Sequence, residues 1–237
     1  TTTLYTALNS LNTEERKVIT VEDPVEYNLA GINQIQINPT IGLSFSSALR
    51  SIVRQDPDVI MVGEMRDLET AKICVQSSLT GHLVLSTLHT NDAASSITRL
   101  LEMGVEDYLL NSTLNIVLAQ RLVRTLCEHC REAYSPNEGL VREFGLDKLQ
   151  LEGELQLFHA RGCEDCGGTG YRGRVGIIEM LPMSDAIREL ILKHASAGKI
   201  EKVAKENGMH SMFEDGCHKA LQGLTTIEEV VRVTQEA

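Results

Sequence analysis

Four of the six cysteines form two Cys-x-x-Cys pairs, CEHC and CEDC, which are separated by 32 residues. Two such pairs can bring four thiolates to one tetrahedral Zn²⁺, and the two-residue spacing lets backbone amides point at the sulfurs. A redox dithiol is the alternative, but a redox pair is usually single and lies at the start of a helix. We therefore predict a structural zinc site with four ligands: Cys127, Cys130, Cys163 and Cys166.

Carboxylates and imidazoles flank three apolar runs of the sequence. Glu22 ends VITVE and Glu64 ends DVIMVGE, and a third run, HLVLSTLH, begins with His82 and ends with His89. An apolar strand that ends in a carboxylate is typical of a Walker B motif, in which the acid holds Mg²⁺ beside nucleotide phosphates. Ligands of open parallel sheets bind beyond the carboxyl ends of the strands. We therefore expect these two carboxylates and two histidines to converge on one edge, where they could hold a metal, activate water and donate to phosphate oxygens.

Some of these residues also have a structural explanation. Glu22 and Asp23 precede Pro24, which stops a strand, so both acids could belong to an ordinary turn. His89 could simply begin the next helix. The hypothesis therefore depends on the grouping of three polar strand ends and not on any one residue.

The elements that must position these residues alternate between strand and helix through about residue 126. Strands are predicted at 18–22, 32–38, 58–64 and 82–88, of which the last two are typical of strands buried on both faces. Helices are predicted at 44–55, 68–80 and 91–104. Ser44 and Asp67 are the predicted N-caps of the first two helices, and Gly104 ends the third. Short joints between strand and helix indicate a parallel α/β sheet.

The pattern changes after residue 126. The segment up to about residue 181 is rich in glycine and short strands, and helices follow from Ser184 onward. Thr226 and Glu229 are spaced as a capping box for the last helix. The two remaining cysteines, Cys74 and Cys217, lie in amphipathic helical patterns and are predicted to be buried.

Composition narrows the class of protein. The chain has 237 residues, of which 42% are hydrophobic and 23% charged, as in ordinary soluble proteins. A net charge of -11, with no Trp, five Tyr and four Phe, argues against a nucleic-acid partner. The apolar runs are much shorter than the roughly 20 residues that span a bilayer, and no signal peptide opens the chain. We therefore expect a soluble cytoplasmic protein.

Longer motifs occur in the order found in the type II secretion and type IV pilus assembly ATPases. ITVEDPVEY resembles the Asp box of that family, LRSIVRQDPDVIMVGEMRDLETA its Walker B region, and TGHLVLSTLHTNDA its His box. LAQRLVRTLCEHC, GCEDCGGTGYRGRVGIIE and TTIEEVVRVTQ continue the resemblance over essentially the whole chain. It is especially close to the GspE and PilB assembly branch, because the retraction branch generally lacks the four cysteines. The resemblance implies a RecA-like P-loop NTPase core that uses ATP and Mg²⁺.

The resemblance also implies roles for individual residues. Glu22 would be the catalytic glutamate that polarises the attacking water, and Glu64 would be the Walker B acid at Mg²⁺. His82 and His89 would sense the γ-phosphate of ATP or link it to domain motion.

Three arginines are further candidates. Arg50 and Arg54 are four residues apart on one predicted helix face, and they could neutralise phosphate charge within or between subunits. The alternative is a solvated face that pairs with nearby acids. Arg174, in YRGRVG, would approach the nucleotide from the zinc side.

One family motif is missing, because G-x-x-x-x-G-K-[ST] occurs nowhere in the chain. GCEDCGGTG is rich in glycine but lacks the lysine, and tight turns around sulfurs explain it better. In the family, a stretch like TTLYTAL follows the phosphate loop. On that alignment Thr1 would ligate Mg²⁺ and Thr2 would lie beside it at a helix N-terminus. We expect the rest of the loop ahead of residue 1, and we expect this chain alone to hydrolyse ATP weakly or not at all.

The sequence is interpreted as a motor domain that couples ATP hydrolysis to assembly of a type IV pilus or a type II secretion pseudopilus. Three parts are expected: a RecA-like core at 1–126, a tetracysteine zinc-binding element at 127–181 and a helical subdomain at 182–237. The expected assembly is a homo-hexamer that works with an inner-membrane platform protein and with cytoplasmic domains of the machinery. It would be cytoplasmic and peripheral to the inner membrane through these partners, with no direct membrane insertion.

Two other interpretations stay open at this point. One is a zinc-ribbon nucleic-acid motor, such as a helicase or translocase, although the acidic balance argues against it. The other is a zinc-stabilised interaction module in which the acids of the sheet are structural.

Overall fold

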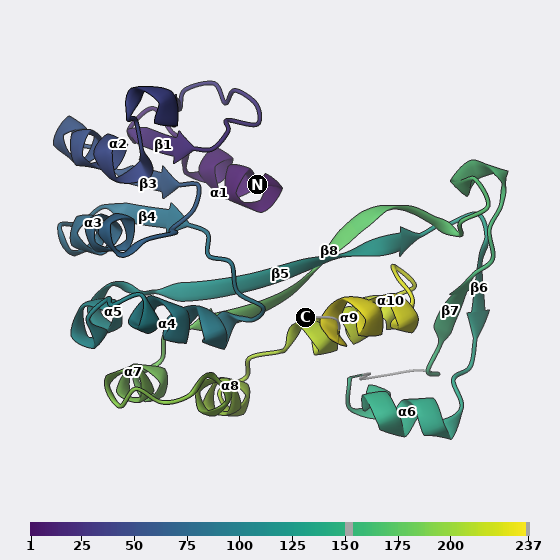
Figure 1. Ribbon diagram of the computed structural model, residues 1–237. Helices are drawn as coiled ribbons and strands as arrows, with labels where there is room; N and C mark the ends of the chain where they lie inside the picture. Colours follow the sequence, from purple (N-terminus) through teal and green to yellow (C-terminus); the bar gives the residue numbers. More distant parts are fainter. Residues whose placement is uncertain (150–153, 236–237) are drawn as a thin grey trace. The chain divides into compact units, whose positions relative to one another are not determined.

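The computed structural model describes residues 1–149 and 154–235, and it divides into two compact units (Figure 1). Unit 1 comprises three segments: Thr1–Thr90, Ser96–Asn115 and Asp185–Ser196. Unit 2 comprises the other three: Asn91–Ser95, Ile116–Ser184 and Ala197–Ala237. These limits differ from the boundaries expected after residues 126 and 181, and the three-part division stays a prediction. Residues 150–153 and 236–237, which belong to the second and third expected parts, lie outside the described residues.

Unit 1 is built on a sheet with the strand order β2-β1-β3-β4. Its strands are β1 (Val18–Glu22), β2 (Asn33–Gln36), β3 (Val59–Val62) and β4 (Leu83–Ser86). All three pairings are parallel, which confirms the predicted parallel α/β sheet. Every residue of the two central strands, β1 and β3, is buried. The prediction that β4 is buried on both faces is wrong, because β4 is an edge strand of the described sheet and Leu83 is 39% exposed.

Helices cover both faces of this sheet. The helices with residues in unit 1 are α1 (Thr2–Leu11), α2 (Phe45–Ile52), α3 (Leu68–Leu79), α4 (Ala93–Glu102), α5 (Asp107–Thr113) and α7 (Asp185–Leu192). On one face, α1 contributes Tyr5 and Leu8 to a core that includes Met61 of β3. On the other face, α2 and α3 share a core with Ile60 of the same strand. Adjacent residues of β3 thus enter different cores, as the alternation of side chains along a strand requires.

The helix ends follow the local signals in the sequence. Ser44 Oγ accepts a hydrogen bond from Ser47 N at 3.2 Å, and Asp67 Oδ1 accepts one from Thr70 N at 2.8 Å. Gly104 has a φ of +94°, the left-handed conformation that often ends a helix, and it follows the end of α4. These predicted caps are confirmed.

Unit 2 contains two antiparallel strand pairs, β5 with β8 and β6 with β7. The elements that it contains outside α4 are β5 (Ile116–Leu126), β6 (Arg131–Tyr134), α6 (Glu138–Phe144), β7 (Leu157–Ala160), β8 (Tyr171–Pro182), α8 (Ala197–Glu206), α9 (Met212–Leu221) and α10 (Ile227–Gln235). Its core joins α9 and α10 to residues of β7 and β8. Among the described residues, no helix of either unit has the length and apolar character of a membrane span.

The two cysteines outside the Cys-x-x-Cys pairs are buried, as predicted. Cys74 of α3 is 3% exposed and Cys217 of α9 is fully buried. Burial raises the pKa of each thiol to about 12. Both therefore stay protonated and fill apolar space.

The capping box predicted for α10 is only half formed. Thr226 Oγ1 accepts a hydrogen bond from Glu229 N at 3.3 Å, as expected. The Glu229 carboxylate does not complete the box, because it accepts hydrogen bonds from Arg124 Nη2 at 2.6 Å and Arg232 Nη2 at 2.8 Å. Burial alone raises the pKa of Glu229, but these guanidinium groups reverse that effect and lower it to about 2. Glu229 therefore links α10 to β5.

Candidate functional site

Glu22, the last residue of β1, is almost fully buried, with 3% of its surface exposed. Its Oε1 accepts hydrogen bonds from Thr20 Oγ1 at 2.5 Å and from Gln34 Nε2 at 3.0 Å. Its Oε2 accepts one from the hydroxyl of Tyr5. Hydrogen bonds to the charged form offset the cost of burying a carboxylate. Glu22 is therefore fixed at the carboxyl end of the central strand.

Glu64 lies at the same edge, just beyond β3. Gly63 N donates to Val21 O at 2.8 Å, which places the ends of β1 and β3 side by side. The Glu64 carboxylate, 13% exposed, contacts Arg66 Nε at 2.5 Å and His89 Nε2 at 2.7 Å. The structure thus brings His89 onto Glu64 and places Glu22 at the neighbouring strand end.

His82 lies at the opposite end of the strands, where the strands of the sheet begin. It precedes β4, and the next residue, Leu83, donates its amide to Asp58 O at 3.0 Å, just before β3 begins. The His82 ring is held at the end of α3, where Nδ1 lies 2.8 Å from Ser77 O and 3.0 Å from Thr80 Oγ1. The expectation that both histidines converge with the two carboxylates is therefore wrong for His82. A residue before a parallel strand and a residue after it lie at opposite edges.

The first turn of α1 lies beside the carboxyl end of β1. Thr1 is the N-cap of α1 and Thr2 is its first residue, and both are exposed. Tyr5 N donates to Thr1 O at 2.9 Å, and the hydroxyl of the same Tyr5 reaches Glu22. Free amides and a partial positive charge at a helix N-terminus suit a phosphate group. The start of α1 and the two carboxylates therefore belong to one region of unit 1.

The three candidate arginines lie in different surroundings. Arg50 of α2 contacts Glu69 Oε1 of α3 at 2.6 Å. Arg54 is exposed and lies in a 3-10 turn at Val53–Gln55, so the prediction of one continuous α-helical face is wrong because α2 ends at Ile52. Arg174 belongs to unit 2, where it is exposed on β8 opposite Arg124 of β5.

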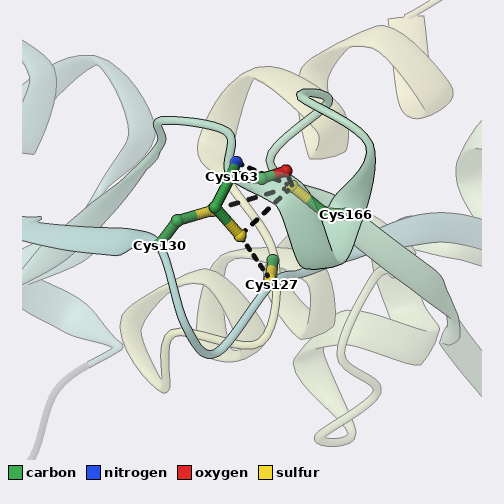
Figure 2. A group of neighbouring side chains, drawn as sticks. All are labelled: Cys127, Cys130, Cys163 and Cys166. Carbon is green, nitrogen blue, oxygen red and sulfur yellow. Dashed lines mark hydrogen bonds between the residues drawn. The ribbon is translucent and has the colours of Figure 1, made fainter.

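The four cysteines of the Cys-x-x-Cys pairs form one cluster in unit 2 (Figure 2). All four Sγ atoms lie within 4.8 Å of one another. The Sγ atoms are 3.8 Å apart for Cys127 and Cys163, 3.9 Å for Cys130 and Cys166, and 3.8 Å for Cys163 and Cys166. A tetrahedral Zn²⁺ with Zn–S bonds of about 2.3 Å requires separations of about 3.8 Å. The cluster therefore has the donor set and the size of a tetrahedral metal site.

Backbone groups around the cluster are arranged as the spacing predicts. Cys163 N and Gly170 N donate to Cys166 Sγ at 3.2 and 3.1 Å. The amide of Cys163 is the main cause that lowers the pKa of Cys166, which falls to about 6. Gly162 has a φ of +94°, and a Cβ there would meet Gly168 O at 2.4 Å. The glycines of GCEDCGGTG thus serve tight turns around the sulfurs.

Comparison with known proteins identifies the family. A family model described as "Type II/IV secretion system protein" matches residues 1–232. The chain belongs to this family. The family and the fold class expected from the sequence motifs are therefore confirmed.

Relatives within the type II/IV secretion system family match nearly the whole chain. The type II secretion system protein E of Xanthomonas campestris pv. campestris is 60% identical over 100% of this chain and 42% of its own length. The type IV pilus assembly ATPase PilB of Thermus thermophilus is 51% identical over 99% of this chain and 26% of its own length. The crystal structure of the pilus retraction motor PilT with bound ADP has a TM-score of 0.69 and 28% identity, over 98% of this chain and 56% of that one. The chain thus spans less than half the length of both curated relatives.

Three polar residues that contact Glu22 in this family member were not predicted from the sequence. They are the donors to Glu22, namely Tyr5, Thr20 and Gln34. Thr20 does carry a signal, because it is a hydroxyl within an otherwise apolar buried strand. Tyr5 and Gln34 carry no such signal. Tyr5 occupies an apolar position of a helical pattern, and Gln34 lies on the polar face of a strand.

Proposed function

We propose that this chain is the motor part of an ATPase that couples ATP hydrolysis to assembly of a type IV pilus or a type II secretion pseudopilus. The observation that supports it most is the placement of Glu22 and Glu64 at neighbouring strand ends, with the first turn of α1 beside Glu22. The names of two relatives, a type II secretion protein E and a type IV pilus assembly ATPase, point to the same function. The motor PilT, whose structure contains ADP, supports nucleotide binding.

Glu22 and Glu64 take different roles in this proposal. Glu64 would hold Mg²⁺, which would neutralise phosphate charge when bound. Glu22 accepts a hydrogen bond from the water that attacks the γ-phosphorus, as the bond to the leaving oxygen of ADP breaks. Thr1 would supply a hydroxyl to the metal and Thr2 a backbone amide to the phosphates.

The histidines and arginines act around these groups. His89 contacts Glu64 and therefore reports occupancy of the phosphate site to the segment that follows it. His82, at the far edge, links the nucleotide state to motion of α3 and β4. Arg50 and Arg54 supply positive charge to phosphates within or between subunits, and Arg174 approaches the nucleotide from the zinc side.

Zn²⁺ occupies the four-cysteine cluster in this proposal and has a structural role. The cluster ties the end of β5 to the turn after β7, because Cys127 follows β5 and Cys163 follows β7. A closed site with four thiolates supplies folding energy and offers no open position for catalysis. The RecA-like core, the zinc element and the helical subdomain, at 1–126, 127–181 and 182–237, are the parts of this motor.

The intact protein works as a homo-hexamer in the cytoplasm. It associates with the inner membrane through a platform protein and cytoplasmic domains of the secretion or pilus machinery. The comparisons support this class of function and give no support to a nucleic-acid motor.

The test uses the full-length protein that contains this chain. Glu22→Gln and Glu64→Gln should each lower the kcat of ATP hydrolysis by at least about 100-fold, because the first weakens the acceptor for the attacking water and the second weakens the ligand for Mg²⁺. Glu15→Gln, at an exposed position between α1 and β1, is the control and should leave kcat unchanged. Normal turnover in both test variants would overturn the proposal, and turnover that depends on added DNA would favour the nucleic-acid motor.

A further inference from the structure

The buried carboxylate of Glu22 is held by donors from three different elements. Oε1 takes the hydroxyl of Thr20, from β1 itself, and the amide of Gln34, from β2. Oε2 takes the hydroxyl of Tyr5, from α1. A carboxylate offers about four acceptor positions. Among the described residues three positions are filled, and the position left over is on Oε2, the oxygen that Tyr5 holds.

Tyr5 is the centre of a larger hydrogen-bond network. It is 1% exposed, and its hydroxyl also accepts from Glu26 N at 3.2 Å and from Gln34 Nε2 at 3.4 Å. The Tyr27 ring packs edge-on against the Tyr5 ring, with the centroids 4.6 Å apart. The hydroxyl thus connects Glu22 to the loop that follows β1.

The backbone of Tyr5 belongs to the first turn of α1. Its amide donates to Thr1 O at 2.9 Å, so one residue contacts both the start of the helix and the Glu22 carboxylate. Its side chain is fully enclosed, which leaves the hydroxyl little freedom to change partners. A shift of this turn would therefore move the hydroxyl relative to Glu22.

We propose that Tyr5 is a positioning residue whose hydroxyl orients Oε2 of Glu22 toward the attacking water and ties that orientation to the first turn of α1. This inference rests on the proposed function, because it assigns the water to Glu22. Gln34 and Thr20 hold the other oxygen, so rotation of the carboxylate is blocked from both sides.

The charges in the network agree with this role. Burial, followed by the hydrogen bond to Glu22, raises the pKa of Tyr5, so the phenol keeps the proton that it donates. The Tyr5 hydroxyl therefore acts as a donor to the Glu22 carboxylate.

The test is Tyr5→Phe in the full-length protein, which removes the hydroxyl and keeps the ring. The kcat of ATP hydrolysis should fall about 10- to 100-fold, because a misplaced catalytic group costs that much. The KM for ATP should not change. Tyr27→Phe removes a hydroxyl from the neighbouring ring, and its kcat and its KM for ATP should match those of the unmodified protein.

A merely structural role for Tyr5 predicts a different result. Tyr5→Phe would then lower the unfolding temperature, while the folded enzyme would keep its kcat, and that outcome would overturn the inference. A double variant sharpens the test, because Tyr5→Phe should have no further effect on kcat once Glu22→Gln is present. Additive effects would show that Tyr5 acts independently of Glu22. If Glu22→Gln alone leaves kcat normal, the proposed role of Glu22 fails instead.

Discussion

His89 and Glu64 form a direct contact, with the imidazole Nε2 2.7 Å from the carboxylate Oε1. The two residues come from the loops after β4 and β3, and a further pair of hydrogen bonds joins these loops. Thr87 Oγ1 donates to Gly63 O at 2.6 Å, and Met65 N donates to Thr87 O at 3.0 Å. The imidazole is therefore held where a change at Glu64 reaches it directly.

The two histidines should differ in their effect on catalysis. His89 lies at the edge that carries both carboxylates, whereas His82 lies at the opposite edge. In the full-length protein we expect His89→Ala to lower the kcat of ATP hydrolysis by about 10-fold or more, by analogy with other displaced catalytic contacts. His82→Ala should have the smaller effect. Equal losses of kcat in two folded variants would contradict this ordering.

The cysteine cluster should hold about one Zn²⁺ per chain, because its sulfur separations match a tetrahedral site. Metal analysis of freshly purified, unchelated protein measures this directly. Cys166→Ser should lose most of the zinc and lower the unfolding temperature, and a strong chelator should do the same to the unmodified protein. Cys74→Ser removes a cysteine of unit 1 and should keep the zinc. Substantially less than one zinc in the unmodified protein would rule out the site.

Glu229 should make unit 2 sensitive to acid. Its folded-state pKa of about 2 lies below the ordinary value of 4.5, so its contribution to stability is complete above pH 4.5 and is lost as the pH falls through about 2. Glu229→Gln should therefore lower the free energy of unfolding at pH 7 by about 2 kcal/mol, since the carboxylate is buried but its arginine partners are half exposed. The difference between variant and unmodified protein should shrink as the pH approaches 2.

The control for that experiment is the preceding residue in the chain. Glu228 is exposed, so Glu228→Gln should change the free energy of unfolding little at either pH. Denaturant unfolding at pH 7 and near pH 3 provides the comparison. A Glu229→Gln difference that stays constant across this range would contradict the assigned pKa.

Replacement of Arg50 tests whether this exposed cation contributes to stability or to catalysis. Its ion pair with Glu69 is formed by side chains that are 66% and 54% exposed. Arg50→Ala should therefore lower the free energy of unfolding by less than about 1 kcal/mol. If ATP turnover by the full-length protein falls by more than this small loss of stability explains, the fall comes from a role of Arg50 at phosphate. Arg99→Ala, which removes a similarly exposed pair with Glu102, should lower neither stability nor turnover appreciably.

What the sequence predicts well is local. Neighbours in the chain determine a buried central strand such as β3 and a cap such as Asp67. They also determine a pair of cysteines with two residues between them. These signals gave the parallel sheet, the helix starts and the cysteine cluster. They did not depend on knowing which strand lies next to which.

What the sequence misses depends on contacts between distant residues. The exposure of β4 follows from its position at the edge of the described sheet, and its apolar sequence does not show that position. The predicted position of His82 was wrong because a motif groups residues that are close in the sequence. The two ends of a strand are far apart in space. The network around Glu22 joins α1, β1 and β2, and Glu229 of α10 also contacts Arg124 of β5. Pairings of this kind have no local signature.

The two units are each made of three separate segments of chain, and unit 1 includes Asp185–Ser196. In that segment Arg188 Nη2 donates to Leu114 O at 3.3 Å, and His194 Nε2 lies 3.0 Å from Asp107 Oδ2. During synthesis, which proceeds from the N-terminus, these contacts cannot form until residues 188 and 194 have been made. Unit 1 is therefore completed only after most of unit 2 has left the ribosome, although it holds the first 90 residues of the chain.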